Sequence, residues 1–160
     1  MGSETNRAIV IEAWKTFATR QPQKIAALFT IDAEWIAPQD NATARALGAP
    51  SGFRGNAEIA HFLAVDFGRV FRSDVQTDFR GFYADGGVVV TEMRLRATLE
   101  GGAPYDNDYC FVFELKDGLI HRLREYMDTA KGYRMIFGGA PSGAPDNEQA
   151  NREFPVPETR

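Results

Sequence analysis

Cysteine, histidine and long apolar runs are scarce in this chain of 160 residues. The single cysteine, Cys110, allows no disulfide within the chain, which fits a reducing compartment. The two histidines, His61 and His121, are far apart, and no HxxH or HxxxH spacing occurs, so we expect no metal site. No segment approaches the roughly 20 apolar residues of a membrane-spanning helix, and the N-terminus lacks the pattern of a signal peptide. We therefore expect a cytoplasmic protein that does not associate with membranes.

Basic residues are also too few for a nucleic-acid-binding protein. The chain has 18 Lys and Arg against 22 Asp and Glu, a net charge of −4, and no basic run is longer than two residues. Proteins that bind nucleic acids usually carry a basic patch, so we expect no nucleic-acid partner. A glycine-rich phosphate loop and a GxSxG elbow are both missing, and we expect no cofactor.

Aromatic residues, by contrast, are plentiful: they make up 12% of the chain, which has twelve phenylalanines. A large hydrophobic core would account for them. A pocket lined with rings would do so equally, since ligand sites are mostly apolar and aromatic. The length favours a single domain, which can bury a substantial core without a disulfide or a metal.

Hydrophobic spacing predicts helices in the first half of the chain. Val10, Trp14 and Phe17 fall on one stripe of an amphipathic helix, Pro22 suits the first turn of a second helix, and Asn56 suits the N-cap of a third. The predicted order is a helix over 5–20, a helix over 23–29, a turn at 30–32, a strand over 33–38, a loop over 39–54 and a helix from 55. Loops as long as the one over residues 39–54 often serve as lids or binding loops in compact domains.

The second half of the chain predicts strands separated by short turns rich in glycine. The strands are expected over residues 75–83, 88–99, 105–115 and 119–127, with a last helical turn over 128–137. Helices followed by a meander of strands indicate an α+β fold with an antiparallel sheet. We expect one domain over residues 1–138. Residues 139–160 are rich in Gly and Pro and predict a flexible or surface-draped tail.

Strand alternation places three polar residues on the apolar face of the sheet. Successive side chains of a strand point to opposite faces. By this rule Asn107 and Tyr109 share a face with Phe111, and Glu125 shares one with Leu119, Leu123 and Met127, while Ile120 lies on the opposite face. A β-bulge would invert the assignment. A carboxyl buried among apolar groups has a raised pKa and can act as a general acid or base near neutral pH. The alternative is that Glu125 lies at a sheet edge, solvated or paired with an arginine.

Other polar residues are weaker candidates for a site. We expect His61 to lie on the surface or at a rim, His121 at the wide end of the sheet, and Asp40 in a turn from which it could reach a pocket mouth. For Cys110, packing within a strand is a better explanation than a catalytic thiol.

The chain resembles the SnoaL-like and ketosteroid-isomerase-like family of the nuclear transport factor two-like superfamily over residues 6–128. The resemblance is carried by WIAP in the first strand, by FRGNAEIAHFL, by the pair Asn107 and Tyr109, and by DGLIHRLREYMD. It implies a cone-shaped domain in which N-terminal helices pack on a strongly curved sheet and enclose a pocket. The superfamily hosts isomerases, cyclases, dehydratases, hydrolases and binding proteins, so the fold alone does not name an activity.

Residues of known family members carry over only in part. Ketosteroid isomerases have an aspartate base where this chain has Ala37, and their second oxyanion-hole residue falls near Tyr109. Limonene-epoxide hydrolases have an Arg and an Asp where this chain has Met93 and Leu95, but their acid on the last strand matches Glu125. The resemblance therefore implies that this chain has neither the isomerase base nor the epoxide-hydrolase Arg–Asp pair. It supports Glu125 as the carboxylate of the site.

The sequence favours a small cofactor-independent enzyme that acts on a hydrophobic molecule by acid–base chemistry, of isomerase, cyclase, dehydratase or hydrolase type. Two alternatives remain, namely a binder of an apolar molecule and a dimerising assembly module. The predicted catalytic residues are Glu125, Tyr109 and Asn107. The predicted substrate-binding residues are Trp14, Phe17, Trp35, Ala37, Met93, Leu95, Phe111, Leu123 and Met127. We also expect a homodimer through the outer sheet face, whose predicted residues are Arg94, Arg96, Arg122, Arg124 and Tyr126.

Overall fold

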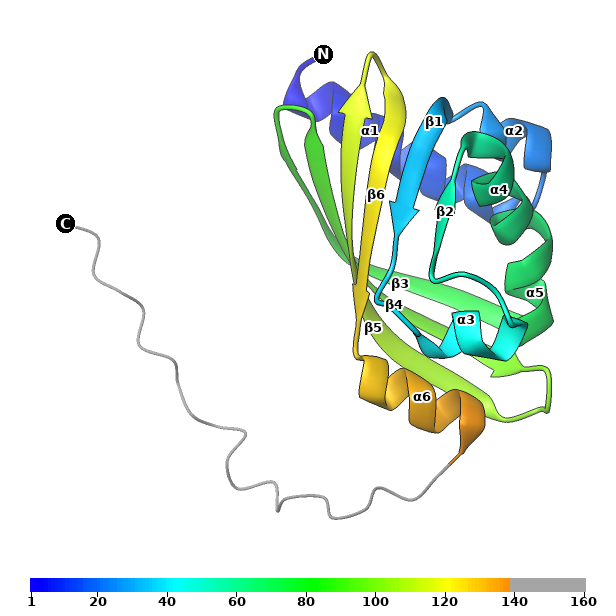
Figure 1. Ribbon diagram of the computed structural model, residues 1–160. Coiled ribbons are helices and arrows are strands. Elements are labelled where there is room, and N and C mark those ends of the chain that lie inside the picture. Colours follow the sequence, from blue (N-terminus) through cyan, green and yellow to red (C-terminus); the bar gives the residue numbers. More distant parts are fainter. Residues whose placement is uncertain (139–160) are drawn as a thin grey trace, which may run out of the picture.

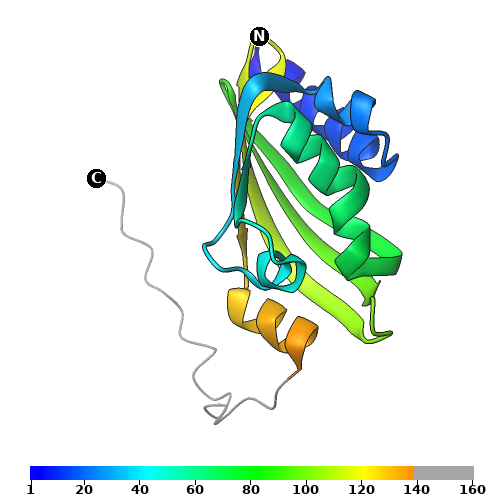
Figure 2. The ribbon, with the colours of Figure 1, turned by 45° about the vertical axis from the view of Figure 1, so that its right-hand side comes forward.

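The computed structural model describes residues 1–138 as helices packed on one face of a six-stranded sheet (Figures 1 and 2). The predicted tail over 139–160 lies outside the described residues. The helical elements are Ser3–Ala18 (α1), Pro22–Ala26 (α2), Ala42–Leu47 (α3), Asn56–His61 (α4), the π-helical Phe62–Asp66 (η1), Phe67–Val70 (α5) and Thr129–Phe137 (α6). The strands are Phe29–Ile36 (β1), Gly52–Arg54 (β2), Phe71–Asp85 (β3), Val88–Leu99 (β4), Pro104–Lys116 (β5) and Leu119–Met127 (β6).

The sheet confirms the predicted α+β class. Its strand order is β2-β1-β6-β5-β4-β3, and every neighbouring pair is antiparallel except β1 and β6, which run parallel. The sheet is strongly curved, and its concave face turns toward α1, α4 and α5, while α6 closes one end (Figure 2). Tight turns at Asp117 and Gly118, both with positive φ, join β5 to β6 as the sequence predicted.

The first helix is fixed to the sheet by its apolar stripe. Val10, Ala13 and Phe17 are buried in the core. Near the start of the same helix, the buried Asn6 donates a hydrogen bond of 2.8 Å to the carbonyl oxygen of Gly86 in the β3–β4 turn. Because a buried amide without a partner is costly, this bond fixes where the helix begins relative to the hairpin.

Two predicted segments near the first strand were wrong. The turn predicted at residues 30–32 belongs to β1, which starts at Phe29 and not at residue 33. Phe29 is buried and pairs with Ile120, and the register against β6 shifts between Phe29 and Glu34. This irregularity leaves Ile31 83% exposed, so the local pattern of polar and apolar residues imitates a turn.

The predicted loop over 39–54 also contains regular structure. It includes α3 and the short strand β2, which pairs with β1. The helix is capped at its N-terminus by Asn41, whose side-chain oxygen accepts a hydrogen bond of 3.0 Å from the Ala44 amide, and at its C-terminus by Gly48 with φ of 63°. Helices this short have little periodicity to detect, so only their caps are visible in sequence.

Strand alternation holds along β4 and β5 but fails at the start of β6. Between the pairs Leu115–Ile120 and Glu114–Arg122, β6 contains one extra residue, His121, which forms a β-bulge. The bulge buries Ile120 and leaves Leu119 37% exposed, the reverse of the prediction. Beyond the bulge the predicted alternation is restored.

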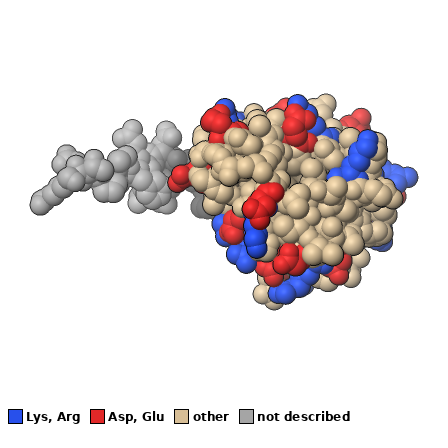
Figure 3. Space-filling model, turned by 90° about the horizontal axis from the view of Figure 1, so that it is seen from above, with Lys and Arg blue, Asp and Glu red and all other residues tan. Residues whose placement is uncertain are grey.

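Acidic and basic side chains are interspersed on the face seen from above, without an extended region of one sign (Figure 3). Among residues 1–138, no helix is both long and apolar enough to cross a membrane.

Candidate active site

A cavity of about 160 Å³ lies between the concave face of the sheet and the helices. A cavity of roughly 150 Å³ in an engineered protein admits benzene, so this one can hold at least a ring-sized group. Most of its walls are apolar. The polar or charged side chains among its lining residues are those of Arg20, Asn41, Thr43, Ser51, Thr77, Tyr109 and Glu125, together with the indole N–H groups of Trp14 and Trp35.

Glu125 is the carboxylate of this cavity. It lies on β6 opposite Phe111 of β5, beyond the bulge, and so points to the concave face. The indole Nε1 of Trp35 donates a hydrogen bond of 2.8 Å to its Oε2. Burial raises the pKa of the Glu125 carboxyl to about 7, although the Trp35 hydrogen bond acts in the opposite direction. Near neutral pH the group is therefore present in both its acid and its base form.

Aromatic packing holds this carboxyl in place. The Trp35 ring contacts Phe53, Phe62 and Phe111 edge to face, with centroids 6.1, 5.4 and 6.3 Å away. Trp14 also packs edge to face against Phe111, with ring centroids 5.0 Å apart. Because these rings restrict the Trp35 indole, its N–H keeps a fixed direction toward Glu125.

Tyr109 lines the same cavity and also the smaller pocket beside α6. Its hydroxyl oxygen lies 2.6 Å from that of Tyr105, and both rings are buried. Burial is the main cause that raises the pKa of both phenols, and the negative charge of Glu125 acts in the same direction. Both tyrosines are therefore neutral hydrogen-bond donors at neutral pH.

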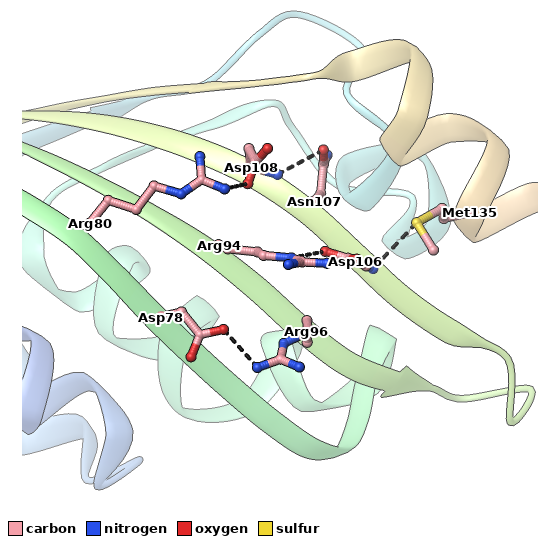
Figure 4. Close-up of polar contacts among 8 residues, drawn as sticks. All are labelled: Asp78, Arg80, Arg94, Arg96, Asp106, Asn107, Asp108 and Met135. Atoms are coloured by element: carbon pink, nitrogen blue, oxygen red, sulfur yellow. Dashed lines mark hydrogen bonds and ion pairs between the residues drawn. The ribbon is translucent and has the colours of Figure 1, made fainter.

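Asn107 is hydrogen-bonded to this tyrosine pair. Its side-chain nitrogen donates to the Tyr105 hydroxyl at 3.3 Å and to the Asp128 carbonyl at 3.0 Å. Its side-chain oxygen accepts from the Asp108 amide at 3.0 Å (Figure 4). Either hydroxyl can be the donor in the bond between Tyr105 and Tyr109. When Tyr105 donates, the proton of Tyr109 is free for another acceptor.

The structure brings most of the predicted site residues together. Glu125 and Tyr109 line the cavity. Seven of the predicted substrate-binding residues line it too, namely Trp14, Phe17, Trp35, Ala37, Met93, Leu95 and Phe111. Three predicted residues lie outside the lining, namely Asn107, Leu123 and Met127. Asn107 and Leu123 are fully buried in the fold, and Met127 faces a smaller pocket beside α6.

Several lining residues were missed by the sequence analysis. Phe53, Phe62 and Phe67 come from β2, η1 and α5, and Arg20 follows the C-cap of α1. Phe62 and Phe67 carried a visible signal, because they follow the start of the helix predicted from residue 55, whereas Phe53 lay in the predicted loop over residues 39–54. The arginine carried none, because a charged residue at the end of an exposed helix normally faces solvent.

The weaker candidates lie outside this lining. His61 is exposed and pairs with Asp66, and His121 lies near Thr30 and Asp32 on the bulge. Asp40 has a positive φ of 55° beside the N-cap of α3, which fits a turn residue. Within residues 1–138, no group of three His, Cys, Asp or Glu side chains is arranged to hold a metal ion.

Comparison with known proteins places this arrangement in a class. Residues 10–123 match the model of the SnoaL-like domain. Because that match spans well over half of the chain, the chain belongs to the SnoaL-like domain family, as the sequence resemblance predicted. A search of curated proteins gives no significant match.

Solved structures show the same nuclear transport factor two-like fold. A protein of this fold from Burkholderia xenovorans LB400 is 20% identical, with a TM-score of 0.70 over 85% of this chain and 98% of that one. TerC, crystallised with polyporic acid, is 23% identical, with a TM-score of 0.69 over 82% and 98%. An epoxide hydrolase from M. tuberculosis, described as LEH-like, is 21% identical, with a TM-score of 0.65 over 84% and 90%. Other structures of the fold are assigned as a polyketide cyclase and isomerases.

Proposed function

We propose that the protein is a small enzyme that acts on a hydrophobic molecule by proton transfer, with Glu125 as the acid or base. The observation that carries this proposal is a buried carboxyl, with a pKa of about 7, at the wall of a mostly apolar cavity. General acid–base groups work best when their pKa lies near the operating pH. This chemistry needs no cofactor.

Tyr109 would stabilise the negative charge that such a reaction creates. When a base removes a proton beside a carbonyl group, or a nucleophile opens an epoxide, charge develops on the substrate oxygen. A fixed neutral donor aimed at that oxygen stabilises the transition state more than the ground state. In this proposal Tyr105 and Asn107 are positioning residues that orient the Tyr109 proton, and Asn107 does not touch the substrate.

The test is turnover of a panel of apolar substrates by the purified protein, followed by mass spectrometry or NMR. Suitable probes are aryl epoxides, for addition of water, and enolisable aryl ketones in deuterated water, for proton exchange. We expect turnover of at least one probe by the wild type and its loss in Glu125→Gln. Turnover that survives this substitution unchanged would refute the assignment.

A binder of apolar molecules is the second candidate, because the same cavity would serve it. The observation in its favour is that Glu125 is the sole carboxylate among the lining residues in the described part of the chain, so two-carboxylate mechanisms lack a partner. A ligand that binds tightly and is recovered unreacted from every probe class would support this reading over catalysis.

We propose further that the convex face of the sheet forms a homodimer. Its arginines are neutralised within the chain, by Arg80–Asp108 at 2.8 Å, Arg94–Asp106 at 2.7 Å and Arg96–Asp78 at 2.7 Å (Figure 4). On the same face, Glu114 pairs with Arg122 and Arg124. The less polar side chains between these two groups of ion pairs are Val90, Cys110, Val112 and Tyr126, and Tyr126 is 52% exposed. An apolar patch bordered by satisfied charges suits contact with a second copy.

Light scattering during size exclusion tests this dimer. We expect a mass twice that of the 17.8 kDa chain, and a shift toward monomer in Tyr126→Glu because the new charge would be buried in the interface. Tyr133→Glu, on the exposed part of α6, is the matched control and should leave the mass unchanged. A monomeric wild type at high concentration would contradict the proposal.

A further inference from the structure

Arg20 places a guanidinium in the wall of the cavity. It follows the C-cap residue of α1 and adopts a positive φ of 56°, which turns the chain away from the helix axis. Its Nη1 donates a hydrogen bond of 2.7 Å to the carbonyl oxygen of Leu63 in η1, and its Cζ lies 4.2 Å from the centroid of the Phe67 ring. Leu63 and Phe67 also line the cavity.

This guanidinium has unused hydrogen-bonding capacity. Arg20, Arg45 and Arg134 are the arginines without an ion pair in the described chain, and the other two are exposed. A guanidinium has five N–H donors, and Leu63 is the acceptor that Arg20 has among residues 1–138. Burial lowers the pKa of Arg20 without a neighbouring carboxylate to oppose it. A partly desolvated cation of this kind gains most from an anionic partner.

Aromatic rings connect the arginine to the proposed catalytic carboxyl. Phe67 lies under the guanidinium, its ring centroid is 6.5 Å from that of Phe62, and Phe62 is 5.4 Å from Trp35, which donates to Glu125. A ligand with a ring could pack along this series. Its charged group would then reach Arg20 while another part approaches Glu125 and Tyr109.

We propose that the cavity binds a hydrophobic acid, a largely apolar, ring-bearing molecule whose anionic oxygen group pairs with Arg20. The inference deepens the proposed function and rests on it in one respect, namely that the cavity holds an apolar ligand. It adds the substrate class, and it assigns Arg20 as the residue that selects it.

A structural role is the competing explanation. The bond to Leu63 and the contact with Phe67 join α1 to η1 and α5, so Arg20 could serve only to fix these helices. Loss of that role would lower stability, and it would weaken charged and neutral ligands alike. A selective effect on acids would follow only from a direct contact.

The experiment compares aryl carboxylates with their uncharged amides. Benzoate and 2-naphthoate are titrated against benzamide and 2-naphthamide by calorimetry, at constant pH, with wild type, Arg20→Gln, Arg20→Lys and the exposed control Arg134→Gln. For the wild type and the control we expect each acid to bind about tenfold or more tightly than its amide, as charge-assisted hydrogen bonds allow. In Arg20→Gln the preference should vanish, and in Arg20→Lys part of it should remain. Thermal unfolding of each variant verifies that it is folded.

Each outcome decides between the hypotheses. Equal affinity of the wild type for acid and amide would overturn the role of Arg20 and leave an apolar ligand site intact. A preference that persists in Arg20→Gln would assign acid recognition to another group and also overturn the inference. If no member of either pair binds the wild type, the assignment of the cavity as a site for apolar ligands is wrong, and the proposed function fails with it.

Discussion

Glu125→Gln is expected to stabilise the fold at alkaline pH while it removes activity. The pKa of the carboxyl rises from its ordinary 4.5 to about 7 on folding. The folded protein therefore binds more protons than the unfolded chain between these values, and the free energy of unfolding falls as pH rises through them. The resulting loss of stability amounts to about 3 kcal/mol; it is absent below pH 4.5 and complete above pH 7. Glutamine has no charge to desolvate, and it can still accept the Trp35 hydrogen bond.

Urea unfolding at pH 5 and pH 9 measures this effect. The variant should exceed the wild type in unfolding free energy by about 3 kcal/mol at pH 9, with a much smaller gap at pH 5. Turnover of any substrate found should fall about 100-fold or more. Glu114→Gln is the matched control, because Glu114 lies on the convex face and pairs with Arg122 and Arg124. A gap that does not change with pH would mean that Glu125 titrates normally.

Asn107→Ala is expected to lower the free energy of unfolding by about 2–4 kcal/mol. The amide is fully buried, and its loss leaves the Asp128 carbonyl and the Asp108 amide without their partner. Each unsatisfied buried group costs roughly 1–3 kcal/mol. A Cβ at Gly132 would lie 3.2 Å from the Asn107 nitrogen, so α6 packs tightly against this side chain. The loss should therefore loosen α6 first.

Urea unfolding, combined with hydrogen exchange of the α6 amides, tests this expectation. Asn56→Ala is the control, because Asn56 makes one hydrogen bond of 3.3 Å, to the Ala26 carbonyl, and its removal should cost less than about 1 kcal/mol. A small loss of stability together with a large loss of activity would instead place Asn107 in contact with the substrate.

The strand half of the fold was predictable because each strand of the meander alternates over many residues. The pair Leu95–Asn107 lies in the register that alternation and a short turn imply. The pair Phe111–Glu125 depends in addition on the bulge at His121, which shifts β6 by one residue against β5. The segment from β1 to β2 was not predictable. A bulge near the start of β1 and the six-residue helix α3 leave too few residues for a helical or strand periodicity to be recognised.

The candidate site was predictable only where a polar residue interrupts an apolar face. Glu125 and Tyr109 have that signature, and both line the cavity. Asn107 has the same signature, yet it faces the packing of α6, since alternation identifies a face and not a position along it. Arg20 has no such signature, because its place in the wall depends on its positive φ and on the packing of η1.

The bulge at His121 also fixes the sign of the charge that a ligand meets. In β6 Arg124 directly precedes Glu125 and points to the convex face, where it pairs with Glu114. A slip of one residue would exchange an anion for a cation at the cavity wall. The register of this strand therefore decides the chemistry of the cavity. An insertion or deletion between the β5–β6 turn and Leu123 would replace the carboxylate of the proposed proton-transfer site by a guanidinium that favours anions, while the architecture stayed the same.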